Sequence, residues 1–241
     1  MPKLRVYDSK QEAAAAAAEF ILEKLDRALQ NTRRATLAVS GGSTPELMFE
    51  AMARQAFEWS KLQLFFVDER PVPPGHPESN FSMADRALCQ PVGLGAEQVH
   101  RIQGELEPAF AAMRYSDDLV ESFGLDQGEA PHFDVLHLGM GDDAHTASLF
   151  PGEPLILDRS GLVGSVYASA KKSYRVSLLP KVLLHAANTV FLVTGADKAK
   201  PLKAVLEGPQ DFLAYPAQLV DRQAEKVVWF VDTAAAAELK R

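Results

Sequence analysis

The feature that most constrains the fold of this chain is an alternation between short apolar runs and helical patterns. Five runs of apolar or β-branched residues end in turn residues and predict buried strands: 35–40, 62–67, 133–139, 189–195 and 227–232. Segments between them, such as "TPELMFEAMA" and "PAFAAMRYSDDLVESF", carry apolar residues at helical spacing. This alternation is typical of α/β proteins, and it predicts a Rossmann-like, largely parallel sheet with helices on both faces.

One further helix is predicted ahead of these five strands. Ser9 and Glu12 form an S-x-x-E capping box in front of an alanine-rich segment whose larger apolar residues recur at helical spacing. The 241 residues are 47% hydrophobic and 24% charged, which is ordinary for a globular protein able to bury a sizeable core. Because no linker-like stretch, charge run or change of composition divides the chain, residues 1–241 are expected to form a single domain.

Charge and cysteine content narrow the classes of function. A formal net charge of −7 argues against nucleic acid or an anionic membrane as a partner, because both require an excess of basic side chains. The single cysteine, Cys89, cannot form an intramolecular disulfide and is expected to be a core residue. The N-terminus lacks the apolar core of a signal peptide, and no apolar run approaches the ~18 residues of a membrane span. A cytoplasmic protein is therefore expected.

Polar and glycine-rich clusters follow four of the predicted strands. In open parallel sheets, ligands bind just beyond the carboxyl ends of the strands. The clusters at these positions are, in chain order, "SGGSTP", "DERPVPPGHPESN", "GMGDDAH" and "GADKAK". Their shared position predicts one site at that edge of the sheet, and it is stronger evidence than any single cluster.

The first cluster, "SGGSTP", has the features of an anion site. Gly41 and Gly42 lie between a strand and a helix, where backbone N–H groups favour a phosphate and Ser43 and Thr44 add donors. A tight turn with Ser43 or Thr44 merely capping the helix is an equally good interpretation. The cluster matches neither nucleotide-binding glycine pattern, and a nucleophilic Ser40 or Ser43 lacks the G-x-S-x-G context.

The second cluster is a long loop stiffened by prolines. Long ordered loops are often functional, and Arg70 can hold a phosphate or carboxylate through two hydrogen bonds. The alternative is a surface pair of Asp68 and Arg70 with a solvated Glu69.

The third cluster combines two aspartates with a histidine. His145 can act as a base near neutral pH, with Asp142 or Asp143 setting its tautomer. The alternative is that an aspartate caps a short helix in which His145 simply packs. No metal site is predicted, because no second histidine lies at ligand spacing and no cysteine pair occurs. His137, within a predicted strand, is expected to be a core residue.

Cations come from two further segments. Arg175 lies in "YRVSL", and Lys198 and Lys200 lie where a helix is predicted to begin. A cation is unfavourable at a helix N-terminus, so Lys198 indicates a compensating anion, whereas Lys200 is expected to be solvated.

Together these residues resemble the 6-phosphogluconolactonase family, from "LAVSGGSTP" to "FLVTGADKA". The most specific parts are "FFVDERPVPPGHPESN" and "GMGDDAHTASLFPG". The family is similar in fold to glucosamine-6-phosphate deaminase, a single α/β domain without metal or organic cofactor. The resemblance implies hydrolysis of 6-phospho-D-glucono-1,5-lactone to 6-phosphogluconate, the second step of the oxidative pentose phosphate pathway.

The resemblance also implies roles for individual residues. His145 would take a proton from the attacking water and return it to the departing ring oxygen, while Asp143 holds the imidazole. The implied phosphate and sugar-acid contacts are Gly41, Gly42, Ser43, Thr44, Arg70, Arg175 and Lys198. Asp68 stands in the place of the deaminase's base, and its role is left open between substrate contact and ordering of the loop.

One residue departs from the family pattern, and another separates the lactonase from the deaminase. Ala144 stands where the family motif G-x-D-G-H has glycine. If this position needs a positive φ, alanine costs on the order of 1 kcal/mol, and if the substrate approaches the backbone there, the methyl group interferes.

The deaminase has a glutamate five residues beyond the histidine, whereas this chain has Phe150. The lactonase is therefore favoured.

A sugar-phosphate-sensing domain of a transcriptional regulator is the alternative from a different class. Such a protein needs a DNA-binding segment, and the chain shows no basic helix-turn-helix pattern. The expected partner is a small sugar-phosphate lactone, with no nucleic acid and no membrane, and the protein is expected to be a monomer or a small homo-oligomer.

Overall fold

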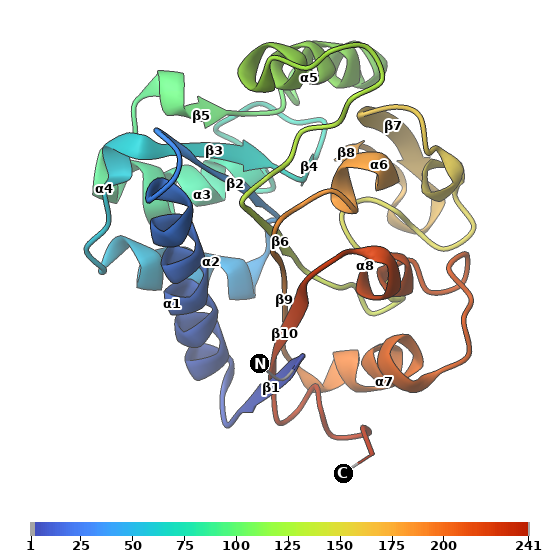
Figure 1. Ribbon diagram of the computed structural model, residues 1–241. Helices are drawn as coiled ribbons and strands as arrows, with labels where there is room; N and C mark the ends of the chain where they lie inside the picture. The colour runs from blue at the N-terminus through green and yellow to red at the C-terminus, as the bar shows by residue number, and fades with distance from the viewer. Residues whose placement is uncertain (1–2, 241) are drawn as a thin grey trace.

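A seven-stranded sheet lies between two groups of helices (Figure 1). The computed structural model describes residues 3–240. The sheet has the order β1-β10-β9-β6-β2-β3-β5, and each pair of neighbouring strands is parallel. Its strands are β1 (Leu4–Tyr7), β2 (Ala35–Val39), β3 (Leu62–Phe66), β5 (Val99–His100), β6 (Val135–Leu138), β9 (Thr189–Val193) and β10 (Val227–Asp232). The predicted parallel α/β architecture is confirmed.

Helices cover both faces of this sheet. The helices are α1 (Lys10–Leu29), α2 (Ser43–Ala53), α3 (Asn80–Ala84), α4 (Gln90–Val92), α5 (Pro108–Phe123), α6 (Pro180–Leu183), α7 (Ala199–Glu207) and α8 (Ala217–Gln223). In Figure 1, α1 and α2 lie on one side of the strands, and α7 and α8 lie on the other. Within residues 3–240, no helix combines the length and the apolar character needed to cross a bilayer.

Helix α1 begins where the sequence predicts, with a small difference in its cap. Ser9 Oγ accepts a hydrogen bond from the backbone N–H of Glu12 at 3.2 Å. In a capping box the Glu12 carboxylate would accept a hydrogen bond from the N–H of Ser9, the N-cap residue. Here it accepts one from the N–H of the preceding residue, Asp8, at 3.1 Å. Two N–H groups at the start of the helix are thus satisfied by side chains.

A second, smaller sheet was not predicted. It consists of β4 (Asp68–Glu69), β8 (Ser173–Leu178) and β7 (Val163–Ala168), all antiparallel. The edge strand β1 was missed as well, so the run at 35–40 is not the first strand. These strands are short or only half-buried, and their sequences therefore lack the continuous apolar character of the central strands.

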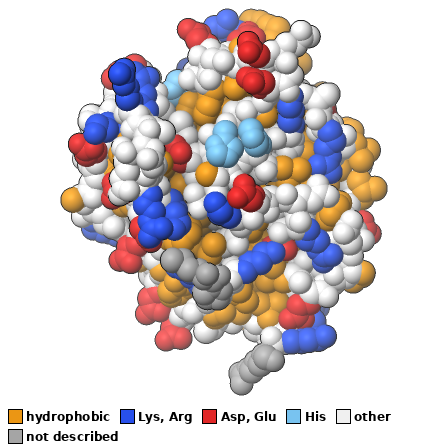
Figure 2. Space-filling model, viewed as in Figure 1, with side chains coloured by type: hydrophobic (Ala, Val, Ile, Leu, Met, Phe, Trp, Pro, Cys, Tyr) orange, Lys and Arg blue, Asp and Glu red, His pale blue; other side chains and the backbone are white. Residues whose placement is uncertain are grey.

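The two residues expected in the core lie there. Cys89 is 2% exposed, and burial raises the pKa of its thiol to about 12. His137 in β6 is fully buried with its ring edge-on to Phe49, and burial lowers its pKa to about 3. On the face shown in Figure 2, basic side chains are interspersed with acidic ones.

Candidate active site

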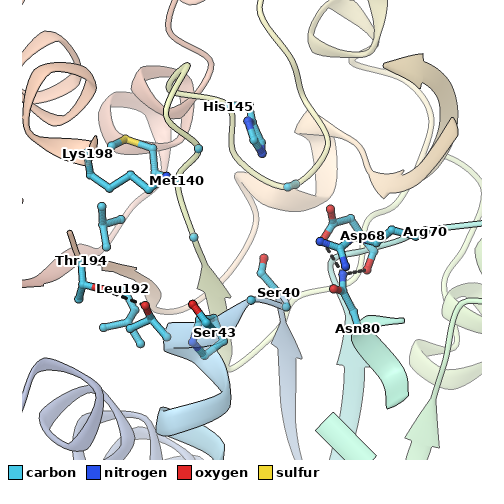
Figure 3. Close-up of a pocket in the computed structure, with 18 residues that line it drawn as sticks. Ser40, Ser43, Asp68, Arg70, Asn80, Met140, His145, Leu192, Thr194 and Lys198 are labelled. Carbon is cyan, nitrogen blue, oxygen red and sulfur yellow. Dashed lines mark hydrogen bonds between the residues drawn. The ribbon is translucent and has the colours of Figure 1, made fainter. Parts of the chain in front are cut away.

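A pocket of about 250 Å³ lies at the carboxyl ends of β2, β3, β6 and β9 (Figure 3). These four strands are neighbours in the sheet, so the structure brings all four clusters together. The predicted site residues that line the pocket are Gly41, Gly42, Ser43, Thr44, Asp68, Arg70, His145 and Lys198. Asp143 and Arg175 are not among its lining residues.

The "SGGSTP" turn presents the open N-terminus of α2 to the pocket. A Cβ on Gly41 would lie 1.9 Å from Asn80 Oδ1, so a side chain at this position would collide with Asn80. Gly42 is the N-cap residue, and no side chain in the described part of the chain caps α2. The capping role considered for Ser43 and Thr44 is therefore wrong. Thr44 Oγ1 instead lies 2.8 Å from Thr194 Oγ1, and the uncapped end of α2 favours an anion.

Glu69 is buried, contrary to the alternative of a solvated side chain. It is 2% exposed, and its carboxylate accepts hydrogen bonds of 2.8–2.9 Å from both ends of the proline-rich loop. The donors are the backbone N–H groups of Arg70, Asn80 and Phe81 and the hydroxyl of Ser79. Burial raises the pKa of Glu69, although these hydrogen bonds oppose the shift. Glu69 thus closes the loop on itself.

Asp68 and Arg70 face the pocket on either side of Glu69. Asp68 is 9% exposed, and its Oδ2 accepts from Ser148 Oγ at 2.7 Å. The guanidinium of Arg70 donates to the backbone carbonyl of Glu78 in the same loop. Arg70 is therefore held at the pocket wall by its own loop.

His145 is oriented by Asp143. Asp143 Oδ1 accepts from the backbone N–H of His145 at 3.0 Å and lies 2.5 Å from its Nδ1. This contact places the proton on Nδ1, while Nε2 has no hydrogen-bond partner among residues 3–240. Burial by itself raises the pKa of Asp143, but the hydrogen bonds and charge of His145 outweigh it and lower the pKa to about 2. The ring of Phe150 lies against the imidazole, with centroids 4.5 Å apart.

The loop around His145 needs unusual backbone geometry. A Cβ on Gly141 would lie 2.1 Å from His145 Nδ1, so glycine allows the imidazole to approach the backbone. Ala144 has a φ of 63°, which is the conformation expected of the family glycine. Its methyl group is fully buried and lies outside the pocket lining. Of the two consequences considered, the backbone cost of about 1 kcal/mol therefore applies and interference with the substrate does not.

The helix-capping alternative for the two aspartates is wrong. Residues 142–143 form a turn that no helix follows. Asp142 Oδ1 lies 3.7 Å from Lys171 Nζ. Asp143 is thus the aspartate that contacts His145.

The two remaining cations differ in position. Lys198 lines the pocket at the start of α7, but Asp197 Oδ2 lies 2.9 Å from its Nζ. Asp197 already supplies an anion, which weakens the argument that Lys198 requires a bound one. Burial lowers the pKa of Arg175, and the charge of nearby Arg70 adds to this shift. Lys200 is exposed, as expected.

Some lining residues were not predicted. Asn80, the first residue of α3, and Thr194 contribute polar groups, and Met140 and Leu192 contribute apolar surface. Asn80 lies within the quoted second cluster, but no sequence pattern distinguishes it from its neighbours. Only the closure of the loop by Glu69 brings it beside Asp68.

The chain is similar to known proteins over nearly its whole length. A family model described as glucosamine-6-phosphate isomerases/6-phosphogluconolactonase matches residues 8–229. The 6-phosphogluconolactonase of Nostoc sp. is 40% identical over 222 residues, covering 92% of this chain and 91% of the relative. Among solved structures, the devB protein superposes with a TM-score of 0.89 at 31% identity and 100% coverage of both chains. The 6-phosphogluconolactonase of Trypanosoma cruzi has a TM-score of 0.88 at 25% identity, covering 100% of this chain and 98% of its own.

Proposed function

The chain belongs to the family of glucosamine-6-phosphate isomerases and 6-phosphogluconolactonases, and from this premise we propose that it hydrolyses 6-phospho-D-glucono-1,5-lactone to 6-phosphogluconate. The observation that carries the proposal is the His145–Asp143 pair, whose free Nε2 belongs to a pocket that also holds an uncapped helix N-terminus. This arrangement joins a base to an anion site, which is what a phosphorylated lactone requires.

His145 acts as the general base of the reaction. Its Nε2 removes a proton from water as the water oxygen bonds to the lactone carbonyl carbon. When the tetrahedral intermediate collapses, the bond from that carbon to the ring oxygen breaks, and the imidazolium returns the proton to the ring oxygen. The products are a carboxylic acid, which ionises, and a free hydroxyl group. Asp143 stays ionised throughout and stabilises the imidazolium.

The phosphate is held by positive groups at the pocket. The N-terminus of α2, with Gly41, Gly42, Ser43 and Thr44, supplies N–H and hydroxyl donors. Lys198 and Arg70 supply charge at the pocket wall. Arg175 does not line the pocket, but it lies near Arg70 and its positive charge attracts the phosphate from there. Binding the phosphate orients the lactone carbonyl toward His145.

Phe150 favours lactone hydrolysis over deamination. Its ring occupies the space beside the imidazole, at the position where the deaminase has a glutamate. At 4% exposure, this position offers an apolar wall and no second acid. Hydrolysis of a strained ester needs little more than one positioned base, which contributes roughly 10²- to 10⁴-fold.

The proposal is tested by the decay of freshly prepared 6-phosphogluconolactone with and without purified protein. A coupled dehydrogenase that consumes 6-phosphogluconate reports the product, and ammonia release from glucosamine 6-phosphate is measured in parallel. Faster lactone decay without ammonia is the expected result. Ammonia release, or no acceleration of lactone decay, would overturn the proposal.

The setting of the reaction is part of the same proposal. We infer a cytosolic enzyme whose partner is the small-molecule substrate, with no nucleic acid or membrane ligand, working as a monomer or small homo-oligomer. Light scattering on the purified protein measures the oligomeric state, and a mass far above a tetramer would contradict it.

A further inference from the structure

The turn that carries Arg70 packs directly on Gly104, a residue of the connection between β5 and α5. A Cβ on Gly104 would lie 2.4 Å from the backbone carbonyl oxygen of Arg70 and 2.7 Å from that of Val72. A Cβ in a protein essentially never comes within 3.0 Å of such an atom, and a backbone oxygen cannot turn aside as a flexible side chain can. Glycine at position 104 therefore allows the two segments to approach this closely.

Position 104 requires space and not an unusual backbone conformation. Gly104 does not have a positive φ, so its backbone conformation is open to other residues. The turn that it contacts is tight, because the N–H of Val72 donates to the carbonyl oxygen of Arg70 at 2.8 Å. A methyl group added at position 104 would therefore press on the backbone of Arg70 itself.

The segment that carries Gly104 is anchored more firmly than the turn. Ile102 is 2% exposed and belongs to the hydrophobic core, whereas residues 70–72 are only half-buried. The guanidinium of Arg101 donates to both carboxylate oxygens of Glu105, at 2.7 and 2.8 Å, and this two-pronged contact closes the segment around Gly104. If a larger residue replaces Gly104, the turn is therefore expected to move.

Arg101 also contacts the other end of the proline-rich loop. Its guanidinium carbon lies 5.7 Å from the ring centroid of Phe81, within the range of a cation–π contact. Phe81 follows Asn80, and its N–H donates to the carboxylate of Glu69 at 2.9 Å. Residues 101–105 thus support the loop from outside at both of its ends, whereas Glu69 ties the two ends together from within.

We propose that residues 101–105, the outer support, position Arg70 at the pocket, and that Gly104 sets the distance between them. The inference rests on the proposed function for the role of Arg70 in holding the phosphate. Residues 101–105 lie outside the pocket lining, so Gly104 is a positioning residue and not a contact of the substrate. In Figure 3, Arg70 lies beside Asp68 and across the pocket from Lys198.

Gly104→Ala is the direct test. Because the turn and Arg70 move, KM for the lactone should rise about 5- to 50-fold, and calorimetric binding of 6-phosphogluconate should weaken by a similar factor. The value of kcat should stay within about twofold, because His145 and Asp143 lie in a different loop.

Gly75→Ala is the matched control. Gly75 lies in the same proline-rich loop and does not have a positive φ. A Cβ at this position would meet no heavy atom within 4 Å among residues 3–240, apart from its neighbours in the chain. KM, kcat and affinity should therefore remain unchanged in this variant.

A double-mutant cycle with Arg70→Ala separates positioning from a general loss of structure. If Gly104 acts through Arg70, adding Gly104→Ala to Arg70→Ala should change the affinity for 6-phosphogluconate by less than about twofold. A merely structural defect would weaken binding by the same factor with and without Arg70, and that result would overturn the proposal. An unchanged affinity in Gly104→Ala would overturn it as well.

Glu105→Gln provides the test if Gly104→Ala does not fold. This variant adds no bulk, but it removes the charge that holds Arg101, and binding should weaken about 2- to 5-fold only while Arg70 is present. Glu23→Gln, which breaks a comparable i,i+4 pair with Arg27 on α1, is its control and should have no effect. In that case an unchanged affinity in Glu105→Gln overturns the proposal. If the affinities follow the expected pattern but lactone decay is not accelerated, the proposed function fails and the positioning role of Gly104 stands.

Discussion

Among residues 3–240, Nε2 of His145 has no hydrogen-bond partner, and three neighbouring residues fix the rest of the ring. Asp143 holds Nδ1, Phe150 packs against the ring, and Gly141 leaves room for the imidazole over the backbone. A base held in this way loses little entropy when the substrate arrives. The proposed proton transfer therefore depends on one side chain, His145, whose orientation is fixed by its neighbours.

The first prediction concerns this side chain. His145→Ala should lower kcat roughly 10²- to 10⁴-fold, because the general base is lost. Binding of 6-phosphogluconate, measured by calorimetry, should stay within a few-fold of the original. His132→Ala, at an exposed histidine, is the control and should be fully active. Parallel loss of product binding would show that His145 is a binding residue.

The second prediction concerns the cations. Lys198→Ala should raise KM about 10- to 100-fold with little change in kcat, because a charge-assisted hydrogen bond to the phosphate is lost. Arg175→Ala should raise KM less, since Arg175 lies outside the pocket lining. Lys200→Ala, an exposed lysine two residues further on, provides the control in the same steady-state assay. A larger effect at Arg175 than at Lys198 would reverse the assignment.

At the scale of elements, one buried carboxylate positions a whole loop. Each oxygen of Glu69 accepts two hydrogen bonds, and the four donors come from the start and the end of the loop. The loop in turn carries Arg70 and leads into Asn80. The hydrogen bonds of Glu69 therefore fix where the loop places Arg70 and Asn80 at the pocket.

Glu69→Gln tests this role. One side of the glutamine amide would turn an N–H group toward two donors, leaving them unpaired, and unfolding free energy should fall by about 1–3 kcal/mol in urea titrations. KM should rise while kcat changes less, because Arg70 and Asn80 shift and His145 does not. Unchanged KM in a destabilised protein would limit Glu69 to a structural role.

At the scale of the whole molecule, the buried His137 links stability to pH. Its pKa is lowered by burial from 6.5 to about 3, so the unfolded chain binds a proton in this range that the folded protein does not. Stability is therefore lost as the pH falls from about 6.5 toward 3, by up to about 1.4 kcal/mol per pH unit from this group.

His137→Leu should remove this contribution. Its unfolding free energy relative to the original protein should increase as the pH is lowered from 7 to 5, because leucine has no proton to bind. Denaturant titrations at several pH values measure the difference, with the exposed His132→Leu as the control. A difference that does not depend on pH would contradict the linkage.

Much of this protein was predictable from local sequence. The five central strands and the exact bounds of the helix at 108–123 follow from hydrophobic periodicity, which reports on a residue's immediate neighbours. The pocket's position follows from the rule that parallel strands end at one edge. His137 was placed in the core because it lies within an apolar strand, and Cys89 because a free cysteine is usually buried.

The remainder depends on contacts between residues far apart in the chain. Asp68 meets Ser148, 80 residues away, and the small antiparallel sheet pairs β4 with β8 more than 100 residues later. The burial of Glu69 and the unpaired atoms of Ser40 and Asn80 arise only when these segments close around the pocket. Sequence alone determined which elements form and where the site lies, since both are local properties. Tertiary structure decided that Glu69 is buried and which polar side chains are paired or left free, because that depends on what folds back against them.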